Sequence, residues 1–274
     1  MNENVSVEKN PQILLALRIK NNEYSLGQFW ASVINLDYPK KNIHIYIIEN
    51  DSTIDDTPEI CDQLKKDFGD QYGSFKVSHL NLGMEDVIYR ERRITNSTIK
   101  YINNIIFLFK NRFYPYAKGK DCQYVFVPQA DIILDSTVIK KSLQEFTNNP
   151  KLSWVAGVTH DRAMFGGQPA VYALEMKSYD KPWRLMPGRA FEKGTADLLT
   201  PKRITKFDKP IMFNVVGYGV SMMPTQLCLD LPLTHYPLGD TFLSYIEAAR
   251  EQGYTEALLS DVNHTHIDRD GSIS

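Results

Sequence analysis

The stretch Gln12-Ile13-Leu14-Leu15-Ala16-Leu17-Arg18-Ile19 is a nearly continuous apolar run that stops abruptly at Lys20. A strand that is apolar on both faces is typical of parallel sheets, in which helices cover both sides. A second run, Ile43-His44-Ile45-Tyr46-Ile47-Ile48, follows a segment with helical spacing of Leu26, Phe29, Trp30 and Val33. Strand, helix and strand in quick succession predict a βαβ unit with a right-handed crossover.

The same alternation continues along the chain. Thr57 and Pro58 form a good N-cap and first-turn pair for a second helix, and a long helix is expected from about Asp86 to Lys110. Further strands are predicted at Phe75 to Leu80, Gln123 to Val127, Ser153 to Val158, Met212 to Val216 and Glu256 to Asp261, with a helix at Thr241 to Glu251. We therefore predict an α/β fold, with a mostly parallel twisted sheet flanked by helices.

The composition is that of an ordinary globular chain. It has 274 residues, of which 43% are apolar and 23% are charged, so disordered, collagen-like and disulfide-stapled classes are excluded. Lys and Arg number 31 against 33 Asp and Glu, which leaves a net charge of −2 and no bulk reason to expect a nucleic-acid or anionic-membrane partner. One domain over 1–274 is expected.

Targeting and redox signals are few. No apolar run approaches the ~20 residues that cross a bilayer, and Met1-Asn2-Glu3-Asn4 lacks the basic start of a signal peptide. Cys61, Cys122 and Cys228 are odd in number and far apart, so they predict neither a disulfide framework nor a zinc site. A reducing, cytoplasmic location is expected.

Polar clusters directly follow three of the predicted strands, at 20–23, 49–53 and 129–131. Ligands of open α/β sheets bind beyond the carboxyl ends of the strands, so the three clusters suggest one site. The chain has no G-x-G-x-x-G after its first strand and no P-loop, which disfavours dinucleotide binding and P-loop chemistry. Carboxylates in 49–57 could instead accept from a base or a ribose. Turn formation and helix capping are the alternative, strongest for Asp55, Asp56 and Thr57.

Two runs, Leu17-Arg18-Ile19-Lys20-Asn21-Asn22-Glu23 and Ile48-Glu49-Asn50-Asp51-Ser52-Thr53-Ile54-Asp55-Asp56-Thr57, resemble the opening of GT-A fold glycosyltransferases. The likeness is to the family 2 type and to relatives of fungal mannosyltransferases with an E-N-D-S-T-x-D-x-T stretch. It implies a metal-dependent hexosyl- or pentosyltransferase that moves a sugar from a nucleotide-sugar donor to an acceptor hydroxyl. By this resemblance, the donor is held by Arg18, Lys20, Asn21, Glu23, Glu49, Asp51 and Ser52.

The resemblance also implies a D-x-D motif after a strand. The matching positions are Gln129 and Asp131, so only Asp131 offers a carboxylate for a divalent metal, and Gln129 is a weaker ligand. A turn or N-cap role for Asp131 is the alternative. His264 and His266 stand where such enzymes often place a metal-binding His, and on an extended segment both would face one side. Oxygen and imidazole ligands suit Mn²⁺, which is expected rather than Mg²⁺. Structural roles stay open for both histidines.

Further positions match the resemblance in the rest of the chain. Arg93, with Asn96 three residues later, corresponds to an Arg near the donor, whereas Arg90 and Arg92 fit a solvated face equally well. Gly217 and Gly219 resemble a glycine-containing strand that approaches the donor sugar. Asp240 resembles the Asp that serves as general base in inverting members, and a helix N-cap is its alternative role.

The acceptor is the least defined part. We expect a nucleotide-sugar-binding half at about 10–158 and an acceptor half at about 159–274. Segment 177–209 carries nine basic and four acidic residues with interleaved aromatic residues, which suits an anionic glycan, or a nucleic acid with a hydroxylated, flipped base, or a plain basic surface. Because Gln129 and Gly239 both depart toward weaker chemistry, a non-catalytic nucleotide-sugar-binding pseudo-transferase is the alternative function.

Overall fold

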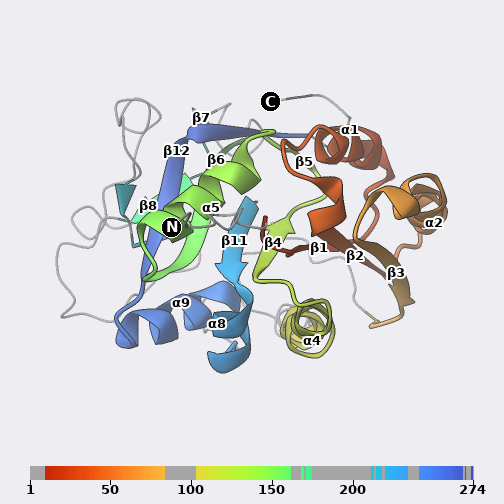
Figure 1. The fold of residues 1–274 in the computed structure, drawn as a ribbon. Coiled ribbons are helices and arrows are strands. Elements are labelled where there is room, and N and C mark those ends of the chain that lie inside the picture. The colour runs from red at the N-terminus through yellow and green to blue at the C-terminus, as the bar shows by residue number, and fades with distance from the viewer. Residues whose placement is uncertain are drawn as a thin grey trace, which may run out of the picture.

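The computed structural model describes residues 10–83, 103–161, 168–169, 171–174, 211–212, 214–217, 220–233, 241–267, 269 and 273. Its main sheet has the strand order β3-β2-β1-β4-β11-β6-β12-β5 (Figure 1). From β3 to β12 every strand runs in the same direction except β11, which is antiparallel to both neighbours. The predicted α/β fold with a mostly parallel sheet is therefore confirmed.

The first half of the chain builds one edge of the sheet. Strand β1 (Ile13–Ile19) pairs with β2 (Ile43–Asn50) and β4 (Tyr124–Pro128), and β2 pairs with β3 (Ser74–Leu80). Helix α1 (Glu23–Ile34) connects β1 to β2, and α2 (Thr57–Phe68) connects β2 to β3. Short 3-10 turns, η1 (Lys40–Asn42) and η2 (Gly69–Gln71), lead into the strands.

The second half completes the sheet and adds a small ribbon. After β5 (Ile132–Ile133) and α5 (Val138–Asn148), β6 (Leu152–Asp161) pairs with β11 (Val220–Pro224) and with the long β12 (Thr255–His266). Helices α8 (Thr225–Asp230) and α9 (Thr241–Glu251) precede β12. The remaining short strands are β7 (Gln168–Pro169), β8 (Val171–Leu174), β9 (Ile211–Met212) and β10 (Asn214–Gly217), of which β8 and β10 pair with each other.

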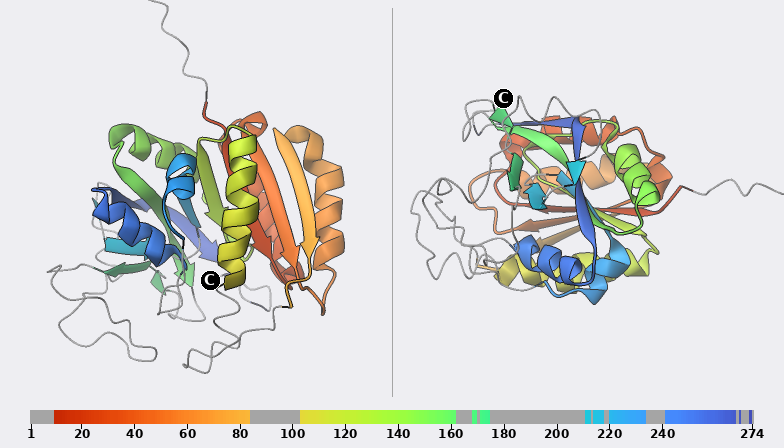
Figure 2. Two further views of the ribbon diagram at one scale, coloured as in Figure 1. Left: turned by 90° about the horizontal axis from the view of Figure 1, so that it is seen from below. Right: turned by 90° about the vertical axis from the view of Figure 1, so that its left-hand side faces the viewer.

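Helices cover both faces of the sheet, as the views in Figures 1 and 2 agree. Helices α1, α2 and α5 pack on one face with the odd-numbered residues of β1, from Ile13 to Ile19. The other face is covered by η3 (Phe109–Phe113), α4 (Tyr114–Gly119), α8 and α9, which share a core cluster with Leu14 and Ala16 of β1. Burial on both faces is why the sequence of β1 is a continuous apolar run rather than an alternating one.

The strand order creates a switch point beside β1. The chain moves from β1 to β2 and β3 on one side, and β4 then adds on the other side of β1. In open α/β sheets the connections diverge at such a point and leave a crevice beyond the carboxyl ends of the two central strands. The carboxyl ends of β1 and β4 carry the first and third polar clusters of the sequence.

The boundaries differ from the prediction in a few places. The helix expected to end at Lys110 continues through a π-helical turn, η3, into α4. The strand expected at Met212 to Val216 falls within β9 and β10, and the last strand extends past Asp261 to His266. None of the helices in the described ranges is long and apolar enough to span a membrane.

Candidate functional site

The ends of β1 and β2 are joined by side chains that bind backbone amides. The Asn21 amide donates to Ser52 Oγ at 3.0 Å, and the Thr53 amide donates to Asn21 Oδ1 at 3.1 Å. Asn21 has a φ of 51°, a left-handed conformation that is uncommon for residues other than glycine. This exchange of hydrogen bonds holds the turn after β1 against the turn after β2.

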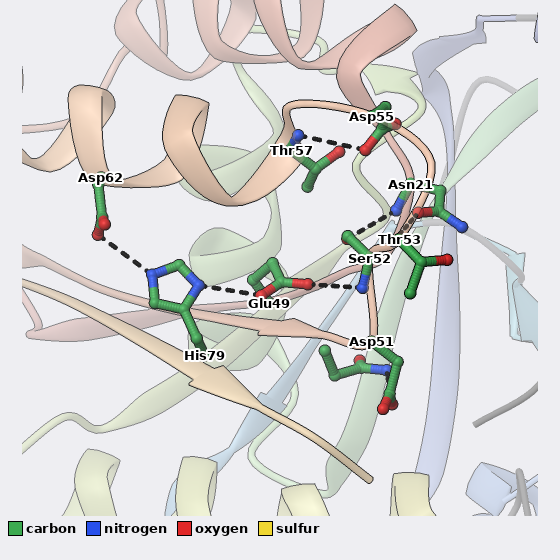
Figure 3. Close-up of polar contacts among 10 residues, drawn as sticks. Asn21, Glu49, Asp51, Ser52, Thr53, Asp55, Thr57, Asp62 and His79 are labelled. Atoms are coloured by element: carbon green, nitrogen blue, oxygen red, sulfur yellow. Dashed lines mark hydrogen bonds and ion pairs between the residues drawn. The ribbon is translucent and has the colours of Figure 1, made fainter. Parts of the chain in front are cut away.

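Glu49 is the innermost acidic residue of this region and is 4% exposed. Its Oε1 accepts from the Ser52 amide at 2.9 Å, and its Oε2 lies 2.9 Å from Nδ1 of His79 on β3. The other ring nitrogen of His79 lies 3.2 Å from Oδ1 of Asp62 on α2 (Figure 3). Glu49, expected to contact a donor, therefore already has both carboxylate oxygens bound within the protein.

Asp51 also has a left-handed backbone, with a φ of 57°, and it bridges the ends of β2 and β3. Its Oδ1 accepts from the amides of Leu82 and Gly83 at 2.9 and 2.8 Å. In Figure 3 its side chain points away from Asn21 and Ser52. The carboxylate of Asp51 thus holds the segment after β3.

The other residues of the first two clusters that were expected to contact the donor also make hydrogen bonds within the protein, through the side chains of Arg18 and Glu23 and the backbone amide of Lys20. Arg18 donates from Nε to Asn50 Oδ1 at 3.0 Å, and the Lys20 amide donates to Asn22 Oδ1 at 3.2 Å. Glu23 is exposed, and its Oε2 accepts from the Asp56 amide at 3.0 Å.

The segment 55–57 has the turn role that the sequence left open. Oδ1 of Asp55 accepts from the Thr57 amide at 3.2 Å, and Oδ2 accepts from the Glu23 amide at 3.2 Å. The hydroxyl of Thr57 accepts from the Asn22 amide at 2.8 Å. These side chains therefore hold the start of α1 against the start of α2.

Asp131 and His266 meet on the other side of the switch point. Nε2 of His266 lies 3.4 Å from Oδ2 of Asp131, and the two side chains are 21% and 26% exposed. They are brought together by antiparallel pairing of β12 with β5, in which His266 is opposite Ile132 and the Ile267 amide donates to the Asp131 carbonyl. Gln129 is exposed in the same connection between β4 and β5.

His264 has a different environment. It is fully buried, and its Nδ1 accepts from the Asp135 amide at 3.0 Å. Its ring lies over Gly157 of β6, where an added Cβ would collide with the imidazole. The structure therefore brings His266, and not His264, to Asp131.

Two residues near Asp131 were not singled out from the sequence. Tyr24, in the first turn of α1, has its pKa raised to about 12 because it is partly buried and close to the charge of Asp131, while the charge of Arg269 opposes this shift. Tyr24 therefore keeps its proton at neutral pH. Neither residue belongs to a sequence motif. Arg269 comes near the site only because of the path of β12, which ends three residues earlier.

Other expected residues lie outside the described residues: Arg93, Gly219 and Asp240, together with segment 177–209. Gly217 is the last residue of β10, opposite Val171 of β8. Within the described ranges, no group of three or more His, Cys, Asp or Glu side chains is arranged to hold a metal ion. Asp131 and His266 offer two ligands, one oxygen and one nitrogen, which leaves coordination positions for a substrate and water.

Comparison with curated proteins gives two partial matches. A segment of 73 residues is 36% identical to the beta-monoglucosyldiacylglycerol synthase of Synechocystis sp., and covers 27% of this chain and 14% of that protein. A segment of 146 residues is 30% identical to a glycosyltransferase 25 family member of Drosophila melanogaster, and covers 51% of this chain and 22% of that protein. The chain thus matches only a small part of each protein, and no family model matches it.

Solved structures resemble the whole fold. GalNAc-T7 with UDP, GalNAc and Mn²⁺ has a TM-score of 0.57 at 15% identity, over 96% of this chain and 45% of the other. The mannosyltransferase PcManGT from Pyrobaculum calidifontis, in complex with GDP-Man and Mn²⁺, has a TM-score of 0.53 at 13% identity, over 96% and 59%. Residues 1–349 of S. aureus TarS give 0.51 at 14% identity, over 92% and 59%. The chain therefore has the GT-A glycosyltransferase fold.

Proposed function

We propose that this chain is a glycosyltransferase that moves a sugar from a nucleotide-sugar donor to an acceptor hydroxyl. The observation that carries the proposal is the Asp131–His266 pair, at 3.4 Å, beside the switch point between β1 and β4 of a GT-A fold. Such sheets bind ligands in a crevice beyond the strand ends. A carboxylate and an imidazole at this place suit a metal ion that would bind the diphosphate of the donor. Partial likeness to named glycosyltransferases supports the same class.

Asp131 and His266 are the proposed holders of a divalent metal, and Mn²⁺ is the favoured ion because oxygen and imidazole ligands suit it and two fold neighbours were solved with it. When bound, the cation would stabilise, as a Lewis acid, the negative charge that develops on the departing diphosphate. The metal ligands supplied by the protein fit this role only together with further ligands from substrate and water, because Gln129 supplies an amide in place of a carboxylate.

The remaining residues are proposed to orient the donor. The Asn21–Ser52 turn lies where the nucleotide would rest, and Lys20 adds a positive charge after β1. The Tyr24 hydroxyl, which stays protonated, can donate a hydrogen bond to a phosphate or sugar oxygen. Arg269 adds a second cation on the Asp131 side, where the donor carries its negative charge.

A donor panel tests this function. The protein is incubated with Mn²⁺ and UDP-, GDP- or other activated sugars, with and without candidate acceptors, and release of the nucleoside diphosphate is measured. Acceptor-dependent release of one nucleotide supports the proposal. Binding of a nucleotide sugar without release or transfer would instead identify a non-catalytic binding module.

Asp240 is proposed as the general base that removes the proton of the acceptor hydroxyl while it attacks the anomeric carbon. Such proton transfer typically contributes ~10²–10⁴-fold to the rate. We expect Asp240→Asn to lower turnover with little change in donor affinity, whereas an equal loss of donor binding would assign Asp240 a structural role. NMR analysis of the product anomer would show inversion if the Asp240 assignment is correct.

The acceptor is proposed to be a glycan or another hydroxyl compound, with nucleic acid as the minor candidate because of the basic segment 177–209. Binding to duplex DNA that weakens steeply with salt would support nucleic acid as the acceptor, and no retention on DNA at low salt would exclude it.

We also propose that the chain is divided into a donor half at about 10–158 and an acceptor half at about 159–274.

A further inference from the structure

His79 lies between two carboxylates on neighbouring elements. Its Nδ1 is 2.9 Å from Oε2 of Glu49 on β2, and its Nε2 is 3.2 Å from Oδ1 of Asp62 on α2 (Figure 3). The side chains of His79 and Asp62 are 40% and 56% exposed, whereas that of Glu49 is only 5% exposed. One partner of the imidazole is therefore buried and the other faces solvent.

The geometry favours a protonated imidazole. An ionised carboxylate only accepts hydrogen bonds, and a neutral imidazole has a single N–H, so it can satisfy only one of the two partners. The imidazolium satisfies both. Burial lowers the pKa of His79, but the hydrogen bonds and charges of Glu49 and Asp62 outweigh burial and raise the pKa above its ordinary value.

No other charged partner of His79 occurs among the described residues. Cys61 on α2 is near Glu49 and Asp62, but burial and the neighbouring carboxylates raise its pKa to about 12, so it stays a neutral thiol. In the described part of the chain, strand β3 pairs only with β2 and also contacts α2 and η2, of which η2 lies at the opposite end of the strand from His79. The charge state of His79 thus depends on Glu49 and Asp62.

Glu49 connects His79 to the proposed donor site through hydrogen bonds. Its Oε1 accepts from the Ser52 amide at 2.9 Å, and Ser52 Oγ in turn accepts from the Asn21 amide at 3.0 Å. Asn21 Oδ1 then accepts from the Thr53 amide. A continuous series of hydrogen bonds therefore runs from His79 to the two turns beyond β1 and β2, as Figure 3 shows.

We propose that His79 is a positioning residue, which in its protonated form holds Glu49 and thereby the Ser52–Asn21 turns in the shape that binds the nucleotide of the donor. This inference rests on the proposed function, because it assigns pH control to the same site. When pH rises and the imidazole loses a proton, buried Glu49 loses its positive partner and its hold on the Ser52 amide loosens. Nucleotide affinity then falls without a change in the chemical step.

The test compares His79→Gln and Asp62→Asn with the wild-type protein from about pH 5.5 to about pH 8.5. His44→Gln is the matched control, because His44 is on the neighbouring strand β2 and binds Gln12 and Ser74 at the opposite end of β2 and β3. Affinity for UDP and GDP is measured by calorimetry with Mn²⁺ present. We expect wild-type affinity to fall about tenfold across the titration of His79, which is the scale of one charged hydrogen bond.

The variants should separate positioning from folding. His79→Gln is expected to bind at the weak, high-pH level throughout, Asp62→Asn to shift the transition to lower pH, and His44→Gln to keep the wild-type profile. If transfer is measured, KM for the donor should change while kcat stays constant. Wild-type affinity and pH dependence in His79→Gln would overturn the proposal.

A second measurement separates this inference from the proposed function. NMR follows the His79 ring and the Ser52 backbone amide during a pH titration without any nucleotide. If the Ser52 signal follows the pKa of His79, the coupling stands, even if no nucleotide binds at any pH and the proposed function fails. A Ser52 signal that ignores the titration of His79 would overturn the coupling itself.

Discussion

The two sides of the candidate site are built in different ways. On the β1–β2 side, the carboxylates of Glu49 and Asp51 accept backbone amides, and the turns owe their shape to these side chains. On the β4–β12 side, the backbone is held by pairing between β5 and β12, and Asp131 and His266 contact each other with about a quarter or less of each side chain exposed. Acidic residues near one switch point thus have different roles: Glu49 and Asp51 hold the backbone, whereas Asp131 contacts a histidine side chain.

This difference has a consequence for how the two sides respond to substitution. Where a side chain shapes the backbone, its removal leaves buried amides or charges without partners and lowers stability. Where strand pairing shapes the backbone, a partly exposed side chain can be changed at little cost to the fold. Substitutions on the β1–β2 side should therefore affect stability and affinity together, whereas substitutions of the partly exposed Asp131 and His266 on the β4–β12 side should affect turnover alone.

The largest effect is expected for Asp131→Asn. Loss of one electrostatic stabiliser of developing charge typically lowers the rate ~10²–10³-fold, and Asp131 is the only carboxylate of the Q-x-D motif. The fold should be unaffected, because the backbone there is held by the hydrogen bond from the Ile267 amide to the Asp131 carbonyl, and the contact of the carboxylate with His266 is partly exposed. Initial rates with the productive donor and the thermal unfolding midpoint are both measured.

Asp261→Asn is the matched control for Asp131→Asn. Asp261 is on the same strand as His266, its side chain is 69% exposed, and its ion pair with Lys141 is on the surface, where such pairs contribute ~0–1 kcal/mol. Full activity in Asp261→Asn and a large loss in Asp131→Asn would agree with the metal assignment. Full activity in both would refute it.

The two histidines of β12 should divide the effects between them. We expect His266→Ala to lower transfer ~10²-fold with little loss of stability, because His266 lies at the partly exposed contact with Asp131. We expect His264→Ala to lower the free energy of unfolding by about 2–3 kcal/mol, because the imidazole is fully buried and binds the Asp135 amide. Urea unfolding and initial rates are compared for both variants.

Gly157→Ala provides a second way to perturb His264 without removing it. The new methyl group would collide with the imidazole, and overpacking of this kind costs about 1–3 kcal/mol. If His264→Ala lost transfer but kept wild-type stability, the roles assigned to the two histidines would be reversed.

Glu49→Gln should show the behaviour of the β1–β2 side. The amide can still accept from the Ser52 amide, but it removes the buried negative partner of His79. We expect the free energy of unfolding at about pH 6 to fall by about 1–3 kcal/mol, with weaker nucleotide binding. Stability measured by urea unfolding that equals the wild type would show that Glu49 does not shape the turn.

The smallest effect is expected from pH alone. The pKa of His79 is raised in the folded protein, so its contribution to stability is fully present below the unfolded value of about 6.5 and is lost as pH rises through the folded pKa. Wild-type stability should therefore decline slightly across this window, and the decline should be absent in His79→Gln. Urea midpoints at several pH values check this expectation, and identical slopes in both proteins would contradict it.

Much of the fold could be predicted from the sequence because the signals are local. The apolar run at 12–19 is buried as β1, and the stripe of Leu26, Phe29, Trp30 and Val33 is the inner face of α1. The polar clusters after β1, β2 and β4 also lie where expected, because the carboxyl ends of parallel strands share one edge of a sheet.

Other features had no local signal. The extension of β12 to His266 depends on pairing with β5 and β6, which are more than a hundred residues earlier in the chain. The π-helical turn η3 is located in the aromatic-rich segment 109–113, where Phe109 and Phe113 pack against each other. His79 has no motif, and its contacts with Glu49 and Asp62 arise only because β3 pairs with β2 and packs against α2 in the structure.

The sequence by itself determined the alternation of strands and helices and the residue types available at the strand ends, since these depend on periodicity and on neighbours along the chain. Only the tertiary structure decided which of these residues are used by the protein's own backbone and which meet across the switch point. The physical reason is that hydrogen bonds such as the one from the Asp135 amide to His264 join residues 129 positions apart, and their geometry exists only after the sheet has formed.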